Sequence, residues 1–176
     1  MLHIQENISL KPYNSFGIDV KANYFVEIFS EEDLKDLFEN EIARTQKLFI
    51  LGGGSNVLFT HDYDGLIIKM SIKGIEAEIA GEEVLVRAGA GEVWSEFVNY
   101  CVNNGYAGVE NLSLIPGTVG ASPIQNIGAY GVELKDVFKS CTAFEIKTGE
   151  IKTFTYADCH FGYRESVFKG GLKGQY

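Results

Sequence analysis

The stretch from Gly105 to Gly131 constrains this sequence most, because it shows neither a helical nor a strand period. It contains six of the chain's 20 glycines and two of its three prolines, yet Glu110 is its only charged residue. Long loops without secondary structure are uncommon in compact domains and are usually functional or disordered. This stretch is too apolar for disorder. We therefore expect an irregular, buried segment whose backbone is satisfied by a large ligand.

The part of this stretch from Ile115 to Gly131 is called here the second glycine box. Its glycines permit close approach of the backbone to a ligand. Its small hydroxyl and amide side chains can hydrogen-bond a pyrophosphate, a ribityl chain or the edge of a flat heteroaromatic ring. The residues predicted to bind a cofactor are Ile115, Pro116, Gly117, Thr118, Gly120, Ala121, Ser122, Gln125, Asn126 and Gly128. The alternative is a buried Ω-loop that only packs.

A first glycine box, Gly52 to Leu58, follows the apolar segment 47–51 directly. Three glycines let the backbone turn sharply, and successive N–H groups can form an anion-binding nest. The box is not a Walker A loop, since no Gly-Lys-Ser/Thr follows, and it does not open a helix as a GxGxxG motif would. The predicted cofactor-binding residues are Gly52, Gly53, Gly54, Ser55, Asn56, Val57 and Leu58. The alternative is a plain connection between two strands.

The overall charge sharpens this prediction. A net charge of −9 and a pI near 4.8 disfavour nucleic acid as a partner. An anionic ligand must therefore be held by local donors, of which backbone N–H groups and single arginines are the most suitable. Two glycine boxes can grip one extended dinucleotide, one holding the phosphates and the other the ring. The residues thus predict a nucleotide or flavin binder.

Other classes of protein are disfavoured. No apolar run approaches the roughly 20 residues that cross a bilayer, and the amino-terminal residues do not resemble a signal peptide. The three cysteines, Cys101, Cys141 and Cys159, are widely spaced and odd in number, which fits a reducing cytoplasm. Cys159 is followed by His160, but no second metal-binding pair accompanies them. We therefore expect a cytoplasmic protein with neither a membrane segment nor a metal site.

Hydrophobic periodicity predicts an α+β fold in which strands predominate. Strands are expected at 24–29, 47–51, 66–70, 75–79, 84–87, 138–147 and 151–154, with a turn at 62–65. Ser30 to Asp33 resembles a capping box that opens a helix extending to Ile42. A second helix is expected at 93–103, and Gly105 stands where a glycine commonly follows a helix end.

Four strings together resemble the UDP-N-acetylenolpyruvoylglucosamine reductase family: Asn14–Ile18, Leu51–Phe59, Glu110–Glu133 and Cys159–Phe168. The resemblance runs from about Leu10 to the last residue. It implies the FAD-binding fold of the vanillyl-alcohol oxidase type, in which two α+β subdomains clasp FAD and a further domain closes over a UDP-sugar. It implies that residues 1–70 form the first subdomain and residues 71–176 an incomplete second one.

The resemblance also implies the chemistry. NADPH reduces FAD, and the reduced flavin reduces the enolpyruvyl group of the UDP-sugar to give UDP-N-acetylmuramate for peptidoglycan. FAD is expected to be non-covalent, since no His lies in or just before either box. Arg164 would stabilise the enolate through its planar fork of donors. Tyr130 and Tyr163 would face the substrate. Without this context Arg164 is a surface ion pair, and core packing is the alternative for each tyrosine.

The same resemblance leaves parts of the enzyme outside this sequence. The family's proton donor and catalytic glutamate lie far downstream of the arginine motif, and its chain is about twice as long. We therefore expect a truncated polypeptide that does not catalyse the full reaction alone. The alternatives are another FAD-dependent oxidoreductase of the same fold, such as an alcohol or sugar oxidase, and a catalytically inert fragment.

Overall fold

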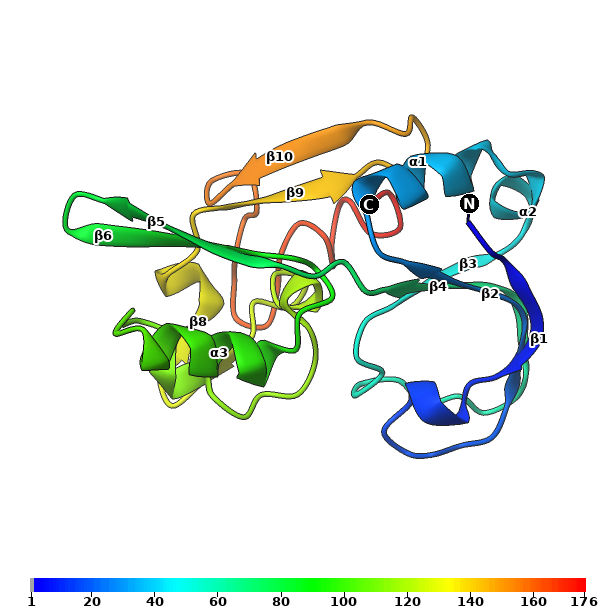
Figure 1. The fold of residues 1–176 in the computed structure, drawn as a ribbon, viewed down its shortest axis with the longest axis horizontal. Coiled ribbons are helices and arrows are strands. Elements are labelled where there is room, and N and C mark those ends of the chain that lie inside the picture. Colours follow the sequence, from blue (N-terminus) through cyan, green and yellow to red (C-terminus); the bar gives the residue numbers. More distant parts are fainter. Residues whose placement is uncertain (1) are drawn as a thin grey trace. The chain divides into compact units, whose positions relative to one another are not determined.

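The structure is a computed structural model that describes residues 2–176, and the chain divides after Lys73 into two compact units. We call the part up to Lys73 unit 1 and the part from Gly74 to Tyr176 unit 2. Figure 1 shows the elements of both. Each unit has its own core, and each is described by itself.

Unit 1 is built on a four-stranded sheet with the order β1-β2-β4-β3. Its strands are β1 (Gln5–Ser9), β2 (Lys21–Ile28), β3 (Leu48–Leu51) and β4 (Tyr63–Met70). β1 pairs with β2 in antiparallel fashion, whereas β2 and β3 both run parallel to β4. Parallel strands at the centre of a sheet are covered on both faces, which explains the continuous apolar run in β4.

Two apolar clusters cover the two faces of this sheet. Because side chains alternate along a strand, Ile67 points into one cluster while Leu66 and Ile68 point into the other. The first cluster consists of Leu10, Val20, Ala22, Phe25, Leu51, Phe59 and Ile67. The second consists of Val26, Ile28, Leu37, Ala43, Leu66 and Ile68. The second cluster takes in both helices of the unit.

The predicted first helix is present but is broken into two. Its capping box is confirmed, since the Ser30 side chain accepts from the Asp33 N–H and the Asp33 carboxylate accepts from the Ser30 N–H. The helix, α1 (Glu31–Glu39), ends at Asn40, whose side chain caps the short helix α2 (Glu41–Thr45). Asn40 favours a cap over a helix interior because its short amide competes with backbone hydrogen bonds.

Unit 2 consists of two-stranded hairpins, an α-helix, short 3₁₀ turns and irregular loops (Figure 1). Its strands are β5 (Ile75–Ala80), β6 (Glu83–Ala88), β7 (Gly128–Ala129), β8 (Val132–Glu133), β9 (Ser140–Phe144) and β10 (Ile151–Thr155). The strands predicted at 75–79 and 84–87 are confirmed and pair as a hairpin about Gly81, with Ala80 opposite Glu83. The strands predicted at 138–147 and 151–154 also pair as a hairpin, but six residues rather than three connect them.

The core of unit 2 forms around helix α3 (Trp94–Asn103), which confirms the helix predicted at 93–103. Trp94 is fully buried, and its indole N–H donates to the Leu112 carbonyl at 2.7 Å. Gly105 follows the helix with a φ of 75°, the left-handed conformation that a glycine adopts without strain. The indole bond ties the helix to the start of the irregular stretch.

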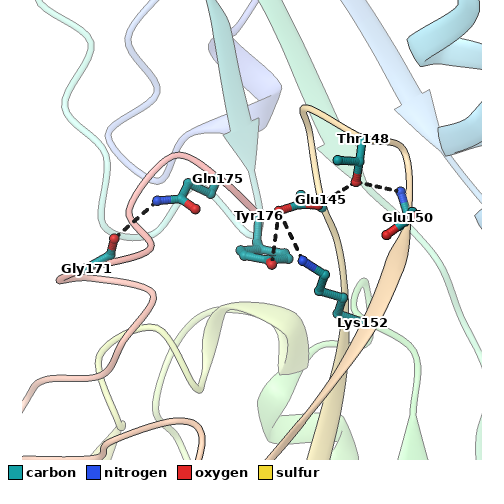
Figure 2. A network of polar contacts seen from close by, with 7 residues as sticks. All are labelled: Glu145, Thr148, Glu150, Lys152, Gly171, Gln175 and Tyr176. Atoms are coloured by element: carbon teal, nitrogen blue, oxygen red, sulfur yellow. Dashed lines mark hydrogen bonds and ion pairs between the residues drawn. The ribbon is translucent and has the colours of Figure 1, made fainter.

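The carboxyl-terminal residues pack on the β9–β10 hairpin through a polar network, drawn in Figure 2. The Glu145 carboxylate accepts from Thr148 at 2.5 Å, from Lys152 at 3.2 Å and from the Tyr176 hydroxyl at 3.3 Å. The Tyr176 ring stacks edge-on against Phe154, with centroids 5.0 Å apart. This network gives the last residues a fixed place within unit 2.

Two local predictions in unit 1 are wrong. Residues 62–65 do not form a turn, because β4 already begins at Tyr63 and the Leu66 N–H donates to the Lys47 carbonyl. The turn prediction gave weight to Gly65, but that glycine instead allows a close strand contact: a Cβ there would lie 2.3 Å from the Lys47 oxygen. The second error is β1, since no strand was predicted before residue 24.

Within residues 2–176, no helix is long and apolar enough to cross a membrane. The same residues contain no group of three His, Cys, Asp or Glu side chains placed to hold a metal ion.

Candidate functional site

The first glycine box lies in unit 1, immediately after β3. Gly54 is buried; Gly52, Ser55 and Val57 are half-buried; Gly53, Asn56 and Leu58 are exposed. Among residues 2–176, no group accepts a hydrogen bond from the backbone N–H groups of Gly53 to Leu58. Backbone donors without protein partners are what a nest offers to an anion. The box therefore retains the donors that phosphate binding requires.

A loop at Asn14 holds this box in place. The Asn14 amide donates to the Leu10 carbonyl at 2.7 Å and to the Ile18 carbonyl at 3.0 Å, and its oxygen accepts from the Ile18 N–H. The Ser15 N–H donates to the Gly54 carbonyl at 3.1 Å. A Cβ on Gly54, whose φ is 67°, would lie 2.0 Å from the Tyr13 oxygen. Gly54 is thus required by contact with the Asn14 loop.

The second glycine box, in unit 2, is organised differently. It folds into short turns, including a 3₁₀ turn at Val119–Ala121, and the N–H groups from Val119 to Ser122 all have acceptors within the chain. The Ala121 N–H donates to Thr118, the Ser122 N–H to Val119, and the Ile127 N–H to Ser122. The stretch is irregular, as predicted. However, hydrogen bonds within its own turns, rather than a ligand, satisfy much of its backbone.

A third glycine-containing segment, Gly89 to Glu92, supports the second box and was missed from sequence. It connects β6 to α3 and accepts from the box: the Gly120 N–H donates to Ala90 and the Val119 N–H to Glu92, each at 2.9 Å. A Cβ on Gly120 would lie 2.6 Å from the Ala90 Cβ. The available signal was Gly-Ala-Gly between a strand and a helix, a common place for a tight connection.

The polar side chains of the second box differ in exposure. Thr118, Ser122 and Asn126 are buried; Ile115, Gly117, Ala121, Gln125 and Gly128 are half-buried; Pro116 and Gly120 are exposed. The Ser122 hydroxyl donates to the Val119 carbonyl at 2.7 Å. The Asn126 amide donates to the Gly162 carbonyl at 2.9 Å and accepts from the Lys135 N–H at 3.0 Å. Contact of these two side chains with a cofactor remains a prediction.

Arg164 lies on a tight turn that rests on the second box. Gly162 and Glu165 bond each other through both backbone pairs, which leaves Tyr163 and Arg164 at the tip. Arg164 has a φ of 54°, and its guanidinium donates to the Gly128 carbonyl at 2.7 Å. A left-handed non-glycine residue costs about 1–3 kcal/mol and persists only where its surroundings fix it.

The guanidinium has room for a ligand. It carries five N–H donors, and its one hydrogen bond within the described chain, to the Gly128 carbonyl, leaves other donors available. Arg164 is exposed and makes no ion pair with residues 2–176, so the surface ion-pair interpretation is wrong. An arginine steered by a carbonyl, rather than neutralised by a carboxylate, keeps its positive charge for an anion.

The two candidate tyrosines are almost fully exposed, Tyr130 at 89% and Tyr163 at 86%. Core packing is therefore the wrong interpretation for both rings. Tyr130 has a φ of 52° and stands at the tip of the β7–β8 hairpin, next to the strand whose carbonyl holds Arg164. Aromatic rings left in solvent on tight turns are available for ligand contact.

Titratable groups near these segments have structural roles. The backbone N–H groups of Glu110 itself and of Gly108 lower the pKa of the Glu110 carboxyl, so the one charged side chain of the irregular stretch caps a turn.

Burial raises the pKa of the Cys141 thiol to about 12, with the Cys159 thiol as a second cause. Burial also raises the pKa values of Cys101 and Cys159. These thiols stay protonated near neutral pH and are poor nucleophiles.

The residues present fit a phosphate-bearing cofactor. Unit 1 contains a glycine turn whose backbone N–H groups from Gly53 to Leu58 have no acceptor among residues 2–176. Unit 2, considered by itself, contains an internally braced glycine box beside Arg164, which makes no ion pair with residues 2–176. Such a donor set recognises anions without lysines, which suits a chain of net charge −9. This chemistry favours a dinucleotide over a metal ion.

Comparison with known proteins shows which family the chain matches. Residues 22–155 match the family described as FAD binding domain. UDP-N-acetylenolpyruvoylglucosamine reductase from Flavobacterium johnsoniae is 51% identical over 99% of this chain, and that from Amoebophilus asiaticus is 52% identical over 99%. The reductase of that name from Pseudomonas putida is 50% identical over 94%. The chain covers 52%, 52% and 49% of these proteins, about half the length of the curated relatives it matches.

Solved structures agree on the fold. The structure of UDP-N-acetylenolpyruvylglucosamine reductase from Thermus caldophilus matches 94% of this chain and 57% of its own, with a TM-score of 0.73 and 23% identity. A vanillyl-alcohol-oxidase-type flavoprotein from Myceliophthora thermophila matches 78% of this chain and 27% of its own, with a TM-score of 0.61 and 17% identity. The fold is thus the α+β FAD-binding type that these flavoproteins share, as the sequence resemblance implied.

Proposed function

The chain belongs to the FAD-binding domain family, and on that premise we propose that it is the FAD-binding part of a UDP-N-acetylenolpyruvoylglucosamine reductase. The full protein would use NADPH to convert UDP-N-acetyl-3-O-enolpyruvylglucosamine to UDP-N-acetylmuramate, a precursor of peptidoglycan. Identity near 50% across nearly the whole chain supports this assignment over an oxidase of the same fold. Units 1 and 2 would be the two subdomains that bind FAD.

The first glycine box would hold the phosphates of FAD. Its N–H groups from Gly53 to Leu58 have no acceptor among residues 2–176, and Gly54 is locked in a left-handed conformation by the Asn14 loop. Preformed donors gain affinity because little ordering remains for the binding step. No His or Cys lies within the box, so the attachment is non-covalent.

Arg164 would bind the carboxylate of the enolpyruvyl group and the negative charge that develops beside it. When bound, FAD supplies the hydride chemistry that links NADPH to the sugar substrate. The Arg164 guanidinium stays charged at any working pH, and a bond to the Gly128 carbonyl orients it in advance. Donors fixed in advance toward developing charge commonly provide the largest single contribution to catalysis.

The exposed rings of Tyr130 and Tyr163 would line the approach of the UDP-sugar. Tyr163 is the immediate neighbour of Arg164 on the same turn, and Tyr130 follows the strand that orients Arg164. Both hydroxyls can donate or accept a hydrogen bond. The three unpaired cysteines, together with an intracellular reductant and substrate, favour a cytoplasmic location.

The observation that carries this proposal is the docking of the Arg164 turn on the second glycine box. Two of the strings that resemble the reductase family, far apart in sequence, are joined through Asn126, Gly128 and Gly162. They form one constellation within unit 2. A fold-level likeness alone would not require the arginine to be next to the box.

The test is a kinetic comparison in the full-length protein. Purified protein should absorb in the visible flavin region, and NADPH oxidation should depend on added UDP-N-acetyl-3-O-enolpyruvylglucosamine. A flavoprotein that ignores this substrate but reduces oxygen while oxidising an alcohol or a sugar would instead be an oxidase. Protein that neither retains nor binds FAD would contradict the proposal altogether.

A further inference from the structure

Asn126 joins two backbone segments beside the Arg164 turn. It is completely buried, with an exposed fraction of 0%, and it lies at the centre of the second glycine box. Its amide nitrogen donates to the Gly162 carbonyl at 2.9 Å, and its amide oxygen accepts from the Lys135 N–H at 3.0 Å. A buried amide with both ends engaged has little left to offer a cofactor, but it fixes the two backbone segments it joins.

The Gly162 carbonyl is also an acceptor of the turn that carries Arg164. The Glu165 N–H donates to it at 3.2 Å, while the Gly162 N–H donates to the Glu165 carbonyl at 3.0 Å. Asn126 thus holds the first residue of the turn, and Arg164 is the left-handed residue two positions later. Because this conformation is strained for a side chain, it needs such external support.

Two further bonds hold the same turn. The Ser166 hydroxyl, 2% exposed, donates to the Ile124 carbonyl at 2.7 Å. The Lys169 ammonium donates to the Arg164 carbonyl at 2.8 Å. The Asn126 and Ser166 bonds form a clasp between the second glycine box and the turn, and the Lys169 bond braces the turn from its own carboxyl-terminal side. The clasp and the guanidinium bond to Gly128 together set where the arginine points.

We propose that Asn126 is a positioning residue, whose buried amide holds the Arg164 turn in its strained conformation on the second glycine box. It acts through Arg164 rather than by touching the cofactor. The proposal rests on the proposed function insofar as Arg164 serves the reaction, but the clasp itself is a property of unit 2. A carboxylate at this position would keep the acceptor for Lys135 and replace the donor to Gly162 with a repelling oxygen.

The first test uses this chain alone and needs no turnover. In Asn126→Asp, hydrogen exchange of the Gly162 and Glu165 amides should quicken by about tenfold or more, because their turn opens more often. Asn14→Asp is the matched control: it places the same change at a buried asparagine in unit 1 whose side chain makes three hydrogen bonds. It should leave these two amides unchanged. Equal exchange in wild type and Asn126→Asp would overturn the clasp.

The second test uses stopped-flow kinetics of the full-length protein. Asn126→Asp should slow reoxidation of the reduced flavin by the UDP-sugar about 10- to 10²-fold, a typical result of displacing a reacting group by about 1 Å. Flavin reduction by NADPH should change little, because Arg164 has no part in it. Equal losses in both half-reactions would mean general damage and would contradict a positioning role. If Asn126→Asp fails to fold, Ser166→Ala should show the same selectivity with a smaller loss.

A double-mutant cycle separates this proposal from the proposed function. Groups that act through one another have non-additive effects. Adding Asn126→Asp to Arg164→Lys should therefore slow reoxidation little beyond Arg164→Lys alone. Losses that multiply would show that Asn126 acts independently of Arg164, and the positioning role would fall. If Arg164→Lys itself leaves reoxidation unchanged, the catalytic role of Arg164 fails, and the exchange result still decides the clasp.

Discussion

The two glycine boxes look alike in sequence but use their backbones in opposite ways. In the first box, the N–H groups from Gly53 to Leu58 have no acceptor among residues 2–176. In the second, those of Val119 to Ser122 are bonded within unit 2. Glycine content therefore indicates only that the backbone makes a close contact, and the contact can be with a ligand or with another part of the chain. In one case that leaves donors for an anion, and in the other it builds a platform for an arginine.

Each box also depends on one buried asparagine. Asn14, 8% exposed, ties the loop that contacts Gly54, and Asn126, 0% exposed, ties the turn that carries Arg164. A buried amide can bond both a donor and an acceptor, so it joins irregular segments that lack sheet or helix ladders. On this basis we propose that the backbone of unit 1 binds the cofactor and that a side chain of unit 2, Arg164, recognises negative charge.

The largest expected effect concerns the charge in unit 2. Arg164→Lys in the full-length protein keeps the positive charge but loses the planar fork that grips a carboxylate at two points. Reoxidation of the reduced flavin by the UDP-sugar should fall by about 10²–10³, the usual loss for a preorganised donor. Reduction of FAD by NADPH should be much less affected. Stopped-flow measurement would contradict this role for Arg164 if both half-reactions slowed equally.

The next largest effect distinguishes, within the first box, a glycine needed for folding stability from a glycine needed for FAD binding. Gly54→Ala should destabilise unit 1 by about 2–5 kcal/mol, because its φ of 67° is strained for alanine and the new Cβ would collide with the Tyr13 oxygen. Gly53 is exposed and is not left-handed, so it provides the matched control. Gly53→Ala should keep the melting temperature and weaken FAD binding. Loss of folding in both variants would refute this distinction.

Gly120 sharpens the same comparison in the second box. We expect Gly120→Ala to cost about 1–3 kcal/mol of folding stability, because its Cβ would press on Ala90 rather than on a ligand. Urea denaturation of the chain without FAD measures this directly. If Gly120→Ala folds with wild-type stability and yet binds FAD poorly, the second box contacts the cofactor more directly than its internal bonding suggests.

The smallest effect is a difference in acid sensitivity. Glu110, Glu145 and Asp158 all lie in unit 2, and hydrogen bonds lower their carboxyl pKa values; for Glu145 the Thr148 hydroxyl is the main cause, ahead of Lys152 (Figure 2). A lowered folded pKa gives stability that is present above the unfolded value, near 4.3 for Glu, and lost as pH falls through the folded value.

Acidification below about pH 4.5 should therefore loosen unit 2 before unit 1. The amide resonances of β9 and β10 should shift at higher pH than those of β2 and β4. Glu145→Gln is the control, since it removes the titrating carboxylate and should flatten the pH response of the hairpin. Simultaneous loss of both units would rule out this ordering.

The sequence predicted the regular elements because their signals are local. A continuous apolar run gives β4, alternating apolar residues give the β5–β6 hairpin, and Ser30 with Asp33 gives the start of α1. Prediction from the sequence failed where a tertiary contact decides the local conformation. Gly65 suggested a turn, but its missing side chain serves a strand contact with Lys47. Asn40 breaks a helix whose apolar face continues across the break.

The segments of the candidate site were predictable from the sequence, but the hydrogen bonds that join these segments were not. Glycine content and low charge located both boxes, and the family resemblance singled out Arg164. No local sequence pattern shows that the Asn126 amide donates to the Gly162 carbonyl, 36 positions away. Nor does any show that the Gly128 carbonyl orients the Arg164 guanidinium. Hydrogen bonds between distant irregular segments have no periodicity, so only a structure assigns them.

The central claim is that the first glycine box presents backbone donors to FAD while the second acts as a platform. A titration of the isotopically labelled chain with FAD, followed amide by amide in NMR spectra, tests it most directly. The account predicts saturable downfield shifts, as expected for N–H groups donating to phosphate, at Gly53 to Asn56 and small shifts at Gly120 to Ser122. Binding of FAD that leaves Gly53 to Asn56 unshifted and moves Gly120 to Ser122 instead would contradict it.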